Sequence, residues 1–266
     1  MNKAEQALHE LREMDTLAAE SSPVHTLCPL AKFFTTIGYI AVVVSFGKYD
    51  FAGLVPMALW PVLLFQISGI PLRACFYKLR FVLPLVLAVG LFNPIFDRAP
   101  YLTLGSVAVS GGVVSMFTLM CKGVFCLTAS FLLMATTRID ALCAALRKLH
   151  VPGMLLTLLL LTYRYVGVMT EEVAIMTDAY RLRAPGQRGV HRSAWGSFLG
   201  QLLLRSMDRA EELYSSMLLR GFHDHFHHAE AAPCTARDVI YVLVCAAAFL
   251  LLRTVNVAAL LGGLFV

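Results

Sequence analysis

The sequence is poor in charged residues. Only 15% of its 266 residues are Asp, Glu, Lys or Arg, whereas 58% are hydrophobic and the mean hydropathy is +0.71. Soluble domains are roughly 45–50% apolar and about 25% charged, so this composition excludes a soluble globular protein and predicts an integral membrane protein. The pI is near 8.9, and we attribute the basic excess to arginines on the cytoplasmic side rather than to a nucleic-acid-binding surface.

The common catalytic and nucleotide-binding motifs are also missing. No glycine-rich run ends in Gly-Lys-Ser/Thr, and neither Gly-x-Ser-x-Gly nor His-Glu-x-x-His occurs. The apolar segments contain no paired carboxylates. These absences predict that the chain is not an enzyme and does not hydrolyse ATP itself, so that another subunit would supply the energy for any uphill transport.

Neither the cysteines nor the N-terminus carries a functional signal. The seven cysteines include no Cys-x-x-Cys pair, and most lie in apolar segments, so we interpret them as small packing residues. Residues 1–20 carry five acids and no apolar core, which is unlike a signal peptide. We expect a short polar helix there, outside the bilayer.

Five apolar segments are candidates for membrane spans, which need roughly 17–25 residues. They cover residues 31–46, 51–68, 81–96, 113–135 and 239–252. The connections at 73–80 and 138–148 are basic, whereas those at 47–50 and 97–112 are not. Since basic loops remain in the cytoplasm, this pattern predicts a cytoplasmic N-terminus.

A further apolar stretch, residues 152–168, does not fit this pattern. If it crossed the bilayer, the segment 178–222, with seven arginines and four acids, would lie outside, against the charge bias. Its apolar core, residues 154–162, is short and is followed by Tyr163-Arg164-Tyr165. We therefore predict a helix from Pro152 to about Arg183 that runs into the cytoplasm.

A second long helix is expected from about Ala194 to Arg220. Apolar residues recur along it at helical spacing, opposite a charged face that includes Arg205 and Arg209. Since neither long helix would stay in lipid, both apolar stripes must be buried on each other or on a partner. A crossed pair of helices docked on a soluble protein satisfies this need.

Both helices are expected to end on an arginine. The first ends at Leu182-Arg183-Ala184, before Pro185-Gly186, and the second ends at Leu219-Arg220-Gly221. The helix dipole favours an arginine in the last turn, and proline or glycine just beyond stops the helix. Ordinary capping would explain either arginine alone, but the repetition favours two guanidinium groups that are presented to a partner.

Two other features are candidates for a binding role. His223, His225, His227 and His228 are close enough in sequence to bind a divalent metal, but the alternative is a solvated polar loop that holds none. Lys122 lies in the middle of the fourth apolar segment, where a charge is costly and usually faces protein or water. It is expected either to snorkel or to contact a membrane partner.

Four stretches together resemble the transmembrane T component of energy-coupling-factor (ECF) transporters, in the cobalt-type branch. They are residues 22–32 (SPVHTLCPLAK), residues 136–172 with Thr136-Thr137, Pro152, Tyr163-Arg164-Tyr165 and Glu171 or Glu172, residues 179–184 (AYRLRA), and residues 204–222 around Arg205, Arg209 and Arg220. The last stretch is the most specific. In the right order, the four cover nearly the whole chain.

The resemblance implies an all-α integral membrane protein with about five transmembrane helices and two long crossed cytoplasmic coupling helices. Its parts would be an N-terminal cytoplasmic segment (1–30), a four-helix transmembrane region (31–136), a cytoplasmic coupling domain (137–236) and a C-terminal transmembrane helix (237–266). The partners would be two ABC-type ATPases, which bind ATP and Mg, and a substrate-capturing membrane S component. The chain itself would hold no cofactor and would lie in a bacterial or archaeal inner membrane.

The family's docking residues map onto the two helix tips. They correspond to Leu182, Arg183, Ala184, Leu219, Arg220 and Gly221, with support in the coupling helices from Arg164, Glu171, Arg205, Arg209 and Met217. The sequence departs from the family pattern because leucine precedes both arginines where alanine is common, and Ala-Pro follows the first.

The resemblance favours transport of cobalt or nickel ions, and two alternatives stay open. One is the T component of a vitamin importer. The other is a self-sufficient secondary permease, which would need buried ionisable residues in several spans and an internal repeat.

Overall fold

In the computed structural model, the described residues are 13–20, 22–96, 100–104, 107–187, 189–222 and 234–254. The chain divides into two compact units. The first comprises residues 1–16 and 139–231, and the second comprises residues 17–138 and 232–266. The second unit is therefore interrupted in sequence by the first.

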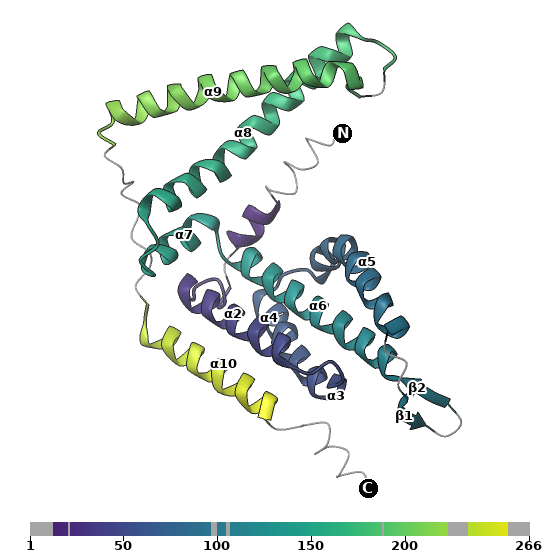
Figure 1. Cartoon of the computed structure of the whole chain (residues 1–266). Coiled ribbons are helices and arrows are strands. Elements are labelled where there is room, and N and C mark those ends of the chain that lie inside the picture. The colour runs from purple at the N-terminus through teal and green to yellow at the C-terminus, as the bar shows by residue number, and fades with distance from the viewer. Residues whose placement is uncertain are drawn as a thin grey trace. The chain divides into compact units, whose positions relative to one another are not determined.

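Apolar helices build the second unit (Figure 1). They are α2 (Pro29–Ser45), α3 (Phe51–Leu54), the 3-10 turn η1 (Val55–Ala58), α4 (Leu59–Ser68), α5 (Leu72–Phe96), α6 (Gly111–Thr136) and α10 (Ala236–Thr254). Phe51–Ser68 and Gly111–Thr136 are long and apolar enough to cross a membrane, and Pro29–Ser45 and Val82–Pro94 are shorter apolar helices. The predicted α-helical membrane fold is confirmed. Helices overlap all five predicted spans, although within the described residues α10, which overlaps the fifth, is not among the helices long and apolar enough to cross.

Two features of the second unit differ from the prediction. A small antiparallel hairpin, β1 (Pro100–Leu104) and β2 (Val107–Ser110), occupies the connection between the third and fourth predicted spans. In addition, α5 begins at Leu72 rather than at residue 81, so part of the basic connection is helical.

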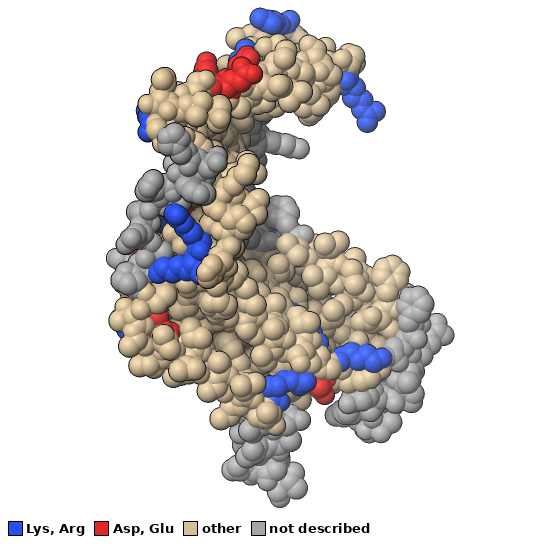
Figure 2. All heavy atoms as spheres, turned by 60° about the vertical axis from the view of Figure 1, so that its left-hand side comes forward, with Lys and Arg blue, Asp and Glu red and all other residues tan. Residues whose placement is uncertain are grey.

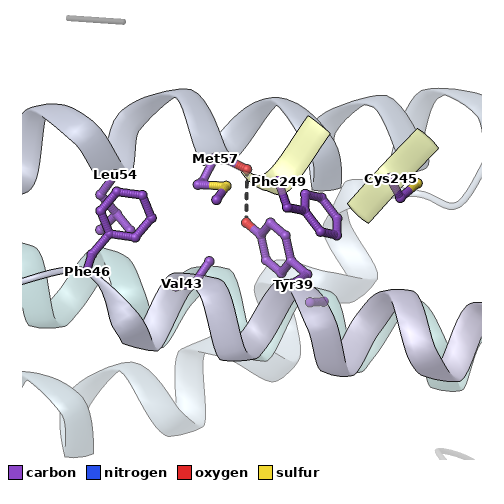
Figure 3. Packing of buried hydrophobic residues seen from close by; sticks show 8 residues of the cluster. Tyr39, Val43, Phe46, Leu54, Met57, Cys245 and Phe249 are labelled. Atoms are coloured by element: carbon purple, nitrogen blue, oxygen red, sulfur yellow. Dashed lines mark hydrogen bonds between the residues drawn. The ribbon is translucent and has the colours of Figure 1, made fainter. Parts of the chain in front are cut away.

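The core of the second unit surrounds a tyrosine on α2 (Figure 3). The Tyr39 hydroxyl donates to the Met57 carbonyl over 2.9 Å, and the Trp60 ring stacks on Tyr39 at 4.5 Å between centroids. In a regular helix the Met57 carbonyl would accept from residue 61, but Pro61 has no N–H. The buried hydroxyl therefore replaces a hydrogen bond that proline removes, which fixes the Phe51–Ser68 segment against α2.

Hydrogen bonds between helix ends define the relative directions of α2, α6 and α10 in the second unit. Asp238, near the start of α10, accepts from the Cys28 N–H at the start of α2, and Arg253 near its end donates to Ser45 O at the end of α2. Lys32 Nζ, also near the start of α2, donates over 2.7 Å to Thr136 O, at the end of α6. Hence α2 and α10 are parallel, and α6 is antiparallel to both. The chain therefore leaves the second unit at the end of α6 and re-enters it at the start of α10, and these two points lie at the same end of the unit.

Two long helices dominate the first unit. It contains α7 (Ile139–Arg147), α8 (Gly153–Arg183), the 3-10 turn η2 (Arg192–Ala194) and α9 (Trp195–Leu219). The helices α8 and α9 meet near the link between them and diverge toward their other ends (Figure 1). The predicted helices match α8 and α9 closely, whereas α7 lies in what the sequence indicated only as a basic connection.

Candidate functional site

The helix α8 ends on the predicted arginine. Its last helical residue is Arg183, and the N–H of Ala184 closes the final turn by donating to Tyr180 O over 3.0 Å. Ala184 then leaves the helix with φ −126°, and Gly186 follows with φ +94°, in the left-handed region that favours glycine. Leu182 is 85% exposed and Arg183 is exposed, so this tip presents both side chains.

The helix α9 ends in a Schellman motif beside the second arginine. The Phe222 N–H donates to Met217 O over 3.0 Å, and the Gly221 N–H donates to Leu218 O over 2.9 Å. Gly221 has φ +78°, as the left-handed position of this motif requires. The two bonds satisfy carbonyls that would otherwise lack partners at the helix end, and Met217, one of the predicted supporting residues, is buried there.

Both arginines are accessible. Arg220 is exposed and the preceding Leu219 is 90% exposed, as Arg183 and Leu182 are at the other tip. Within the part of the chain that the structure describes, neither guanidinium forms an ion pair. Arg183 lies at the link end of α9 and Arg220 at its far end, and the 25 residues of α9 rise about 37 Å. Two separate proteins could therefore each bind one tip.

Side chains order the link that follows Arg183. The Tyr180 hydroxyl donates to Gln187 Oε1 over 2.9 Å and accepts from the His191 N–H over 3.3 Å. His191 in turn caps η2, because its side chain accepts from the Ser193 N–H. Tyr180, which the sequence indicated only as part of an apolar stripe and of the stretch 179–184, thus connects the last turn of α8 to both sides of the link.

An ion pair joins α8 to α9 near the link. Arg205 Nη1 on α9 donates to Glu172 Oε1 on α8, and the two side chains are 46% and 25% exposed. Among the predicted supporting residues, Arg205 therefore lies at the contact between the long helices. Its partner is Glu172 rather than Glu171, which is exposed, because successive residues of a helix point in directions about 100° apart.

Two further predicted supporting residues, Arg209 and Arg164, lie on the surface. Arg209 Nη1 is 3.4 Å from Glu212 Oε2, one turn along α9, and both side chains are mostly exposed; such pairs contribute little to stability. Arg164 is exposed on α8. Its neighbour Tyr163 donates to Asp15 Oδ1 over 2.7 Å, which ties residues 13–16 of the first unit to α8.

The two long helices do not bury their apolar stripes on each other. Exposed large apolar residues include Leu158, Val166 and Ile175 on α8, and Leu199, Leu203, Leu204, Met207, Tyr214 and Leu218 on α9. In Figure 2 the visible surface of this unit, at the top of the view, is mostly uncharged, with a small acidic patch and scattered basic side chains. Contiguous apolar surface on a folded protein is typical of a protein or membrane interaction site.

Lys122 binds the backbone of its own chain. Its Nζ donates to Val44 O over 3.2 Å and to Phe46 O over 2.5 Å, and Arg253 Nη2 donates to Ser45 O over 3.1 Å. These carbonyls lie at the C-terminal end of α2, where intrahelical partners are missing and the helix dipole is negative. These bonds account for a charge in this apolar helix, and contact with a membrane partner stays a prediction.

His223, His225, His227 and His228 lie outside the described residues. Among the residues that are described, no group of three or more His, Cys, Asp or Glu side chains is placed to hold a metal.

Comparison with known proteins gives related transport proteins. Residues 20–229 match the family described as CbiQ, cobalt transport protein. The chain is 29% identical over 223 residues to the cobalt transport protein CbiQ of Rhodobacter capsulatus, which covers 81% of this chain and 87% of that protein. It is 29% identical over 105 residues to the nickel permease LarQ of Lactiplantibacillus plantarum (40% of this chain, 38% of that protein). It is also 25% identical over 135 residues to an uncharacterised protein of Methanocaldococcus jannaschii, a match that spans 46% of that relative and 50% of this chain.

Proposed function

The chain belongs to the CbiQ family of cobalt transport proteins, and on this premise we propose that it is the energy-coupling membrane scaffold (T component) of an ECF-type ABC importer. In this role it links two ATPase subunits to a substrate-capturing membrane subunit, and the ATPases hydrolyse ATP. The observation that carries the proposal is the pair of exposed arginines, Arg183 and Arg220, each at the C-terminal tip of a long helix and at opposite ends of α9.

The chemistry of the tips suits a carboxylate or a row of backbone carbonyls on each ATPase. A guanidinium group donates through a planar fork, so it can form two parallel charge-assisted hydrogen bonds to a carboxylate. The exposed Leu182 and Leu219 add apolar area beside each charge. Each arginine would thus be an anchor in the centre of a small docking surface.

The helix directions in the second unit support a coupling unit on one side of the membrane. Because the chain leaves after α6 and returns at α10 at the same end, the intervening segment must cross the bilayer an even number of times or not at all. By length and composition α8 could cross the bilayer, whereas α9 carries five charged residues between Arg205 and Glu212, which makes it an unfavourable span. We infer that neither crosses and that residues 138–236 lie in the cytoplasm, as their basic flanks predict.

The alternative of a self-sufficient permease has less support. The buried charges of the second unit include Lys32 and Asp238, and both are bound to backbone groups at helix ends. Lys32 donates to Thr136 O, and the two Asp238 oxygens accept from Cys28 and Thr235. These charges therefore stabilise helix ends and are not available to bind a substrate.

For the cargo we propose cobalt or nickel ions. This choice rests on the family, whose description is cobalt transport protein, and on relatives named for cobalt and nickel. In such an importer the ion would be captured by the separate membrane subunit, so a vitamin-specific partner would give the same scaffold another cargo.

Replacement of the tip arginines tests the proposal. In a complex co-expressed with both ATPases and the substrate-capturing subunit, Arg183→Ala and Arg220→Ala should each weaken ATPase co-purification and reduce cobalt or nickel uptake. Truncating a buried charged partner at an interface costs about 2–5 kcal/mol of binding, and lysine should restore only part of the loss because it lacks the planar fork.

The matched control is Arg192→Ala, which removes an exposed arginine from the link. It should leave co-purification and uptake close to normal, while the Arg183→Ala/Arg220→Ala double variant should be worse than either single one. Equal and mild effects at all three positions would mean that the arginines form a generic basic surface, and the coupling assignment would fail.

A further inference from the structure

Two cysteines that are far apart in sequence meet in the second unit. Cys28 is the N-cap residue of α2, and Cys234 lies just before the start of α10. Their Sγ atoms are 2.7 Å apart, closer than an ordinary non-bonded contact and longer than the roughly 2.05 Å of a disulfide bond. A small movement of either side chain would therefore bring the two sulfur atoms to bonding distance.

A single buried carboxylate holds the backbone around this pair. Asp238 Oδ1 accepts from the Cys28 N–H over 2.9 Å, and Asp238 Oδ2 accepts from the N–H of Thr235, the residue after Cys234, over 2.8 Å. The carboxylate thus fixes the start of α2 and the start of α10 at once. As a consequence the two thiols face each other in the folded protein without rearrangement of the helices.

We propose that Cys28 and Cys234 are a redox modification site that forms a reversible disulfide. The two thiols differ in access, because Cys234 is exposed and Cys28 is only 3% exposed. A peroxide therefore reaches Cys234 first, whereas Cys28 is protected from direct oxidation and is in place to react next.

The reaction balances with hydrogen peroxide as the oxidant. The Cys234 thiolate attacks one peroxide oxygen, the O–O bond breaks, and a sulfenic acid and hydroxide form. The Cys28 sulfur then attacks Cys234 Sγ, the S–O bond breaks, and hydroxide leaves. Two thiols and one peroxide become one disulfide and two water molecules, and a dithiol reductant reverses the modification.

The other cysteines provide internal controls. Cys143 in α7 is 1% exposed, and burial, reinforced by the charge of Asp140, raises the pKa of its thiol. A buried thiol that remains protonated reacts slowly. The described structure gives Cys143 no sulfur partner, so it should stay reduced under conditions that oxidise the Cys28–Cys234 pair.

Peptide mapping of the full-length protein in membranes tests the proposal directly. After brief treatment with hydrogen peroxide and blocking of remaining thiols with a maleimide, digestion without reductant should yield a Cys28–Cys234 cross-linked peptide. Reduction with a phosphine before blocking should abolish this peptide and restore two maleimide additions. Because this measurement uses the unmodified chain, it does not depend on whether a variant folds.

Two variants separate the roles of the sulfur atoms. In Cys28→Ser, Cys234 should stop at sulfenic acid and become labelled by dimedone after peroxide treatment. In Cys126→Ser, a matched control on α6, cross-linking should be unchanged. The proposal is overturned if peroxide leaves both thiols open to maleimide, or if Cys28 or Cys234 pairs instead with one of the other five cysteines.

Discussion

At the residue scale, the end of α9 depends on the backbone of Gly221. Its φ of +78° lies in the left-handed region, which costs a residue with a Cβ atom roughly 1–2 kcal/mol. Beyond its chain neighbours, nothing lies within 4 Å of where a Cβ would stand at this position, so the cost is conformational and not steric. We expect Gly221→Ala to lower the unfolding temperature slightly and to weaken ATPase co-purification, because the Arg220 tip loses its fixed geometry.

The control for this prediction lies in the same helix. Gly200 also has open space around a Cβ, but it is in the interior of α9 with ordinary helical geometry. Gly200→Ala should therefore stabilise the helix by roughly 0.5–1 kcal/mol and leave ATPase binding intact. Similar losses of binding in both variants would show that the α9 surface matters rather than the shape of its tip.

Lys122 is predicted to stabilise the second unit. Lys122→Met removes the donor for Val44 O and Phe46 O, and hydrogen bonds to charged groups contribute about 1.5–3 kcal/mol. The unfolding temperature of the purified protein should fall, whereas binding of the membrane partner should persist in the folded fraction. Lys48→Met is the control, because Lys48 lies over the Tyr49 ring at 4.6 Å and should matter less. Normal stability with loss of the membrane partner would favour a contact role for Lys122.

Single residues also show what sequence reasoning could not reach. The tip arginines could be identified because capping signals are local, and the structure has α8 and α9 ending where those signals indicated. The partners of Lys122, by contrast, are carbonyls 76 and 78 residues away, and Cys28 and Cys234 are 206 residues apart. Hydropathy and spacing carry no information on such contacts, since they arise only when helices pack.

At the element scale, the contact between α8 and α9 should control how the two tips are positioned. Glu172→Gln removes the ion pair with Arg205. Since Arg205 is about half exposed, the effect on stability should be small, about 0.2–1 kcal/mol. Uptake per ATP hydrolysed should fall more clearly, because the two tips would no longer be held in one geometry.

The neighbouring acid provides the control for this element. Glu171→Gln makes the same chemical change on the same helix, and it should have the weaker effect because it leaves the Glu172–Arg205 ion pair intact. Exchanging the charges in Glu172→Arg/Arg205→Glu should restore part of the coupling. A stronger effect of Glu171→Gln in uptake assays would contradict the observed pairing.

Most elements could be predicted because apolar runs and helix stop signals are strong in this chain. The observed α8 (Gly153–Arg183) and α9 (Trp195–Leu219) differ little from the predicted ranges. The helix α7 was missed because it is short and carries charges at both ends; its helical form depends on burying Cys143 and Ala145. The β1–β2 hairpin depends on backbone pairing between two short segments. Segments this short have no periodic apolar pattern from which a strand could be predicted.

At the scale of the whole molecule, the sequence order and the helix directions together restrict the topology. The helix α10 is the last of the described helices, yet it lies parallel to α2. Charged residues near its two ends, Asp238 and Arg253, bind the two ends of α2. If the chain crossed the bilayer an odd number of times between α6 and α10, then α10 would be antiparallel to α2. Hydropathy alone would permit α8 to cross, but the direction of α10 is incompatible with α8 as a single crossing between α6 and α10, which supports the proposed cytoplasmic position of this segment.

Labelling of engineered cysteines tests this topology in cells. In a background in which the seven native cysteines are replaced by alanine, Ser193→Cys in the α8–α9 link should not react with a membrane-impermeant maleimide until the cells are permeabilised. Lys48 lies just beyond the end of α2, so it is at the other end of this helix from its cytoplasmic start. Lys48→Cys should therefore react in intact cells. If Ser193→Cys reacts in intact cells, the link lies outside, and neither arginine tip could reach a cytoplasmic ATPase. If instead both positions react only after permeabilisation, both ends of α2 lie in the cytoplasm and α2 does not cross the membrane. Because the ends of α10 are bound to the ends of α2, α10 would then not be a span either.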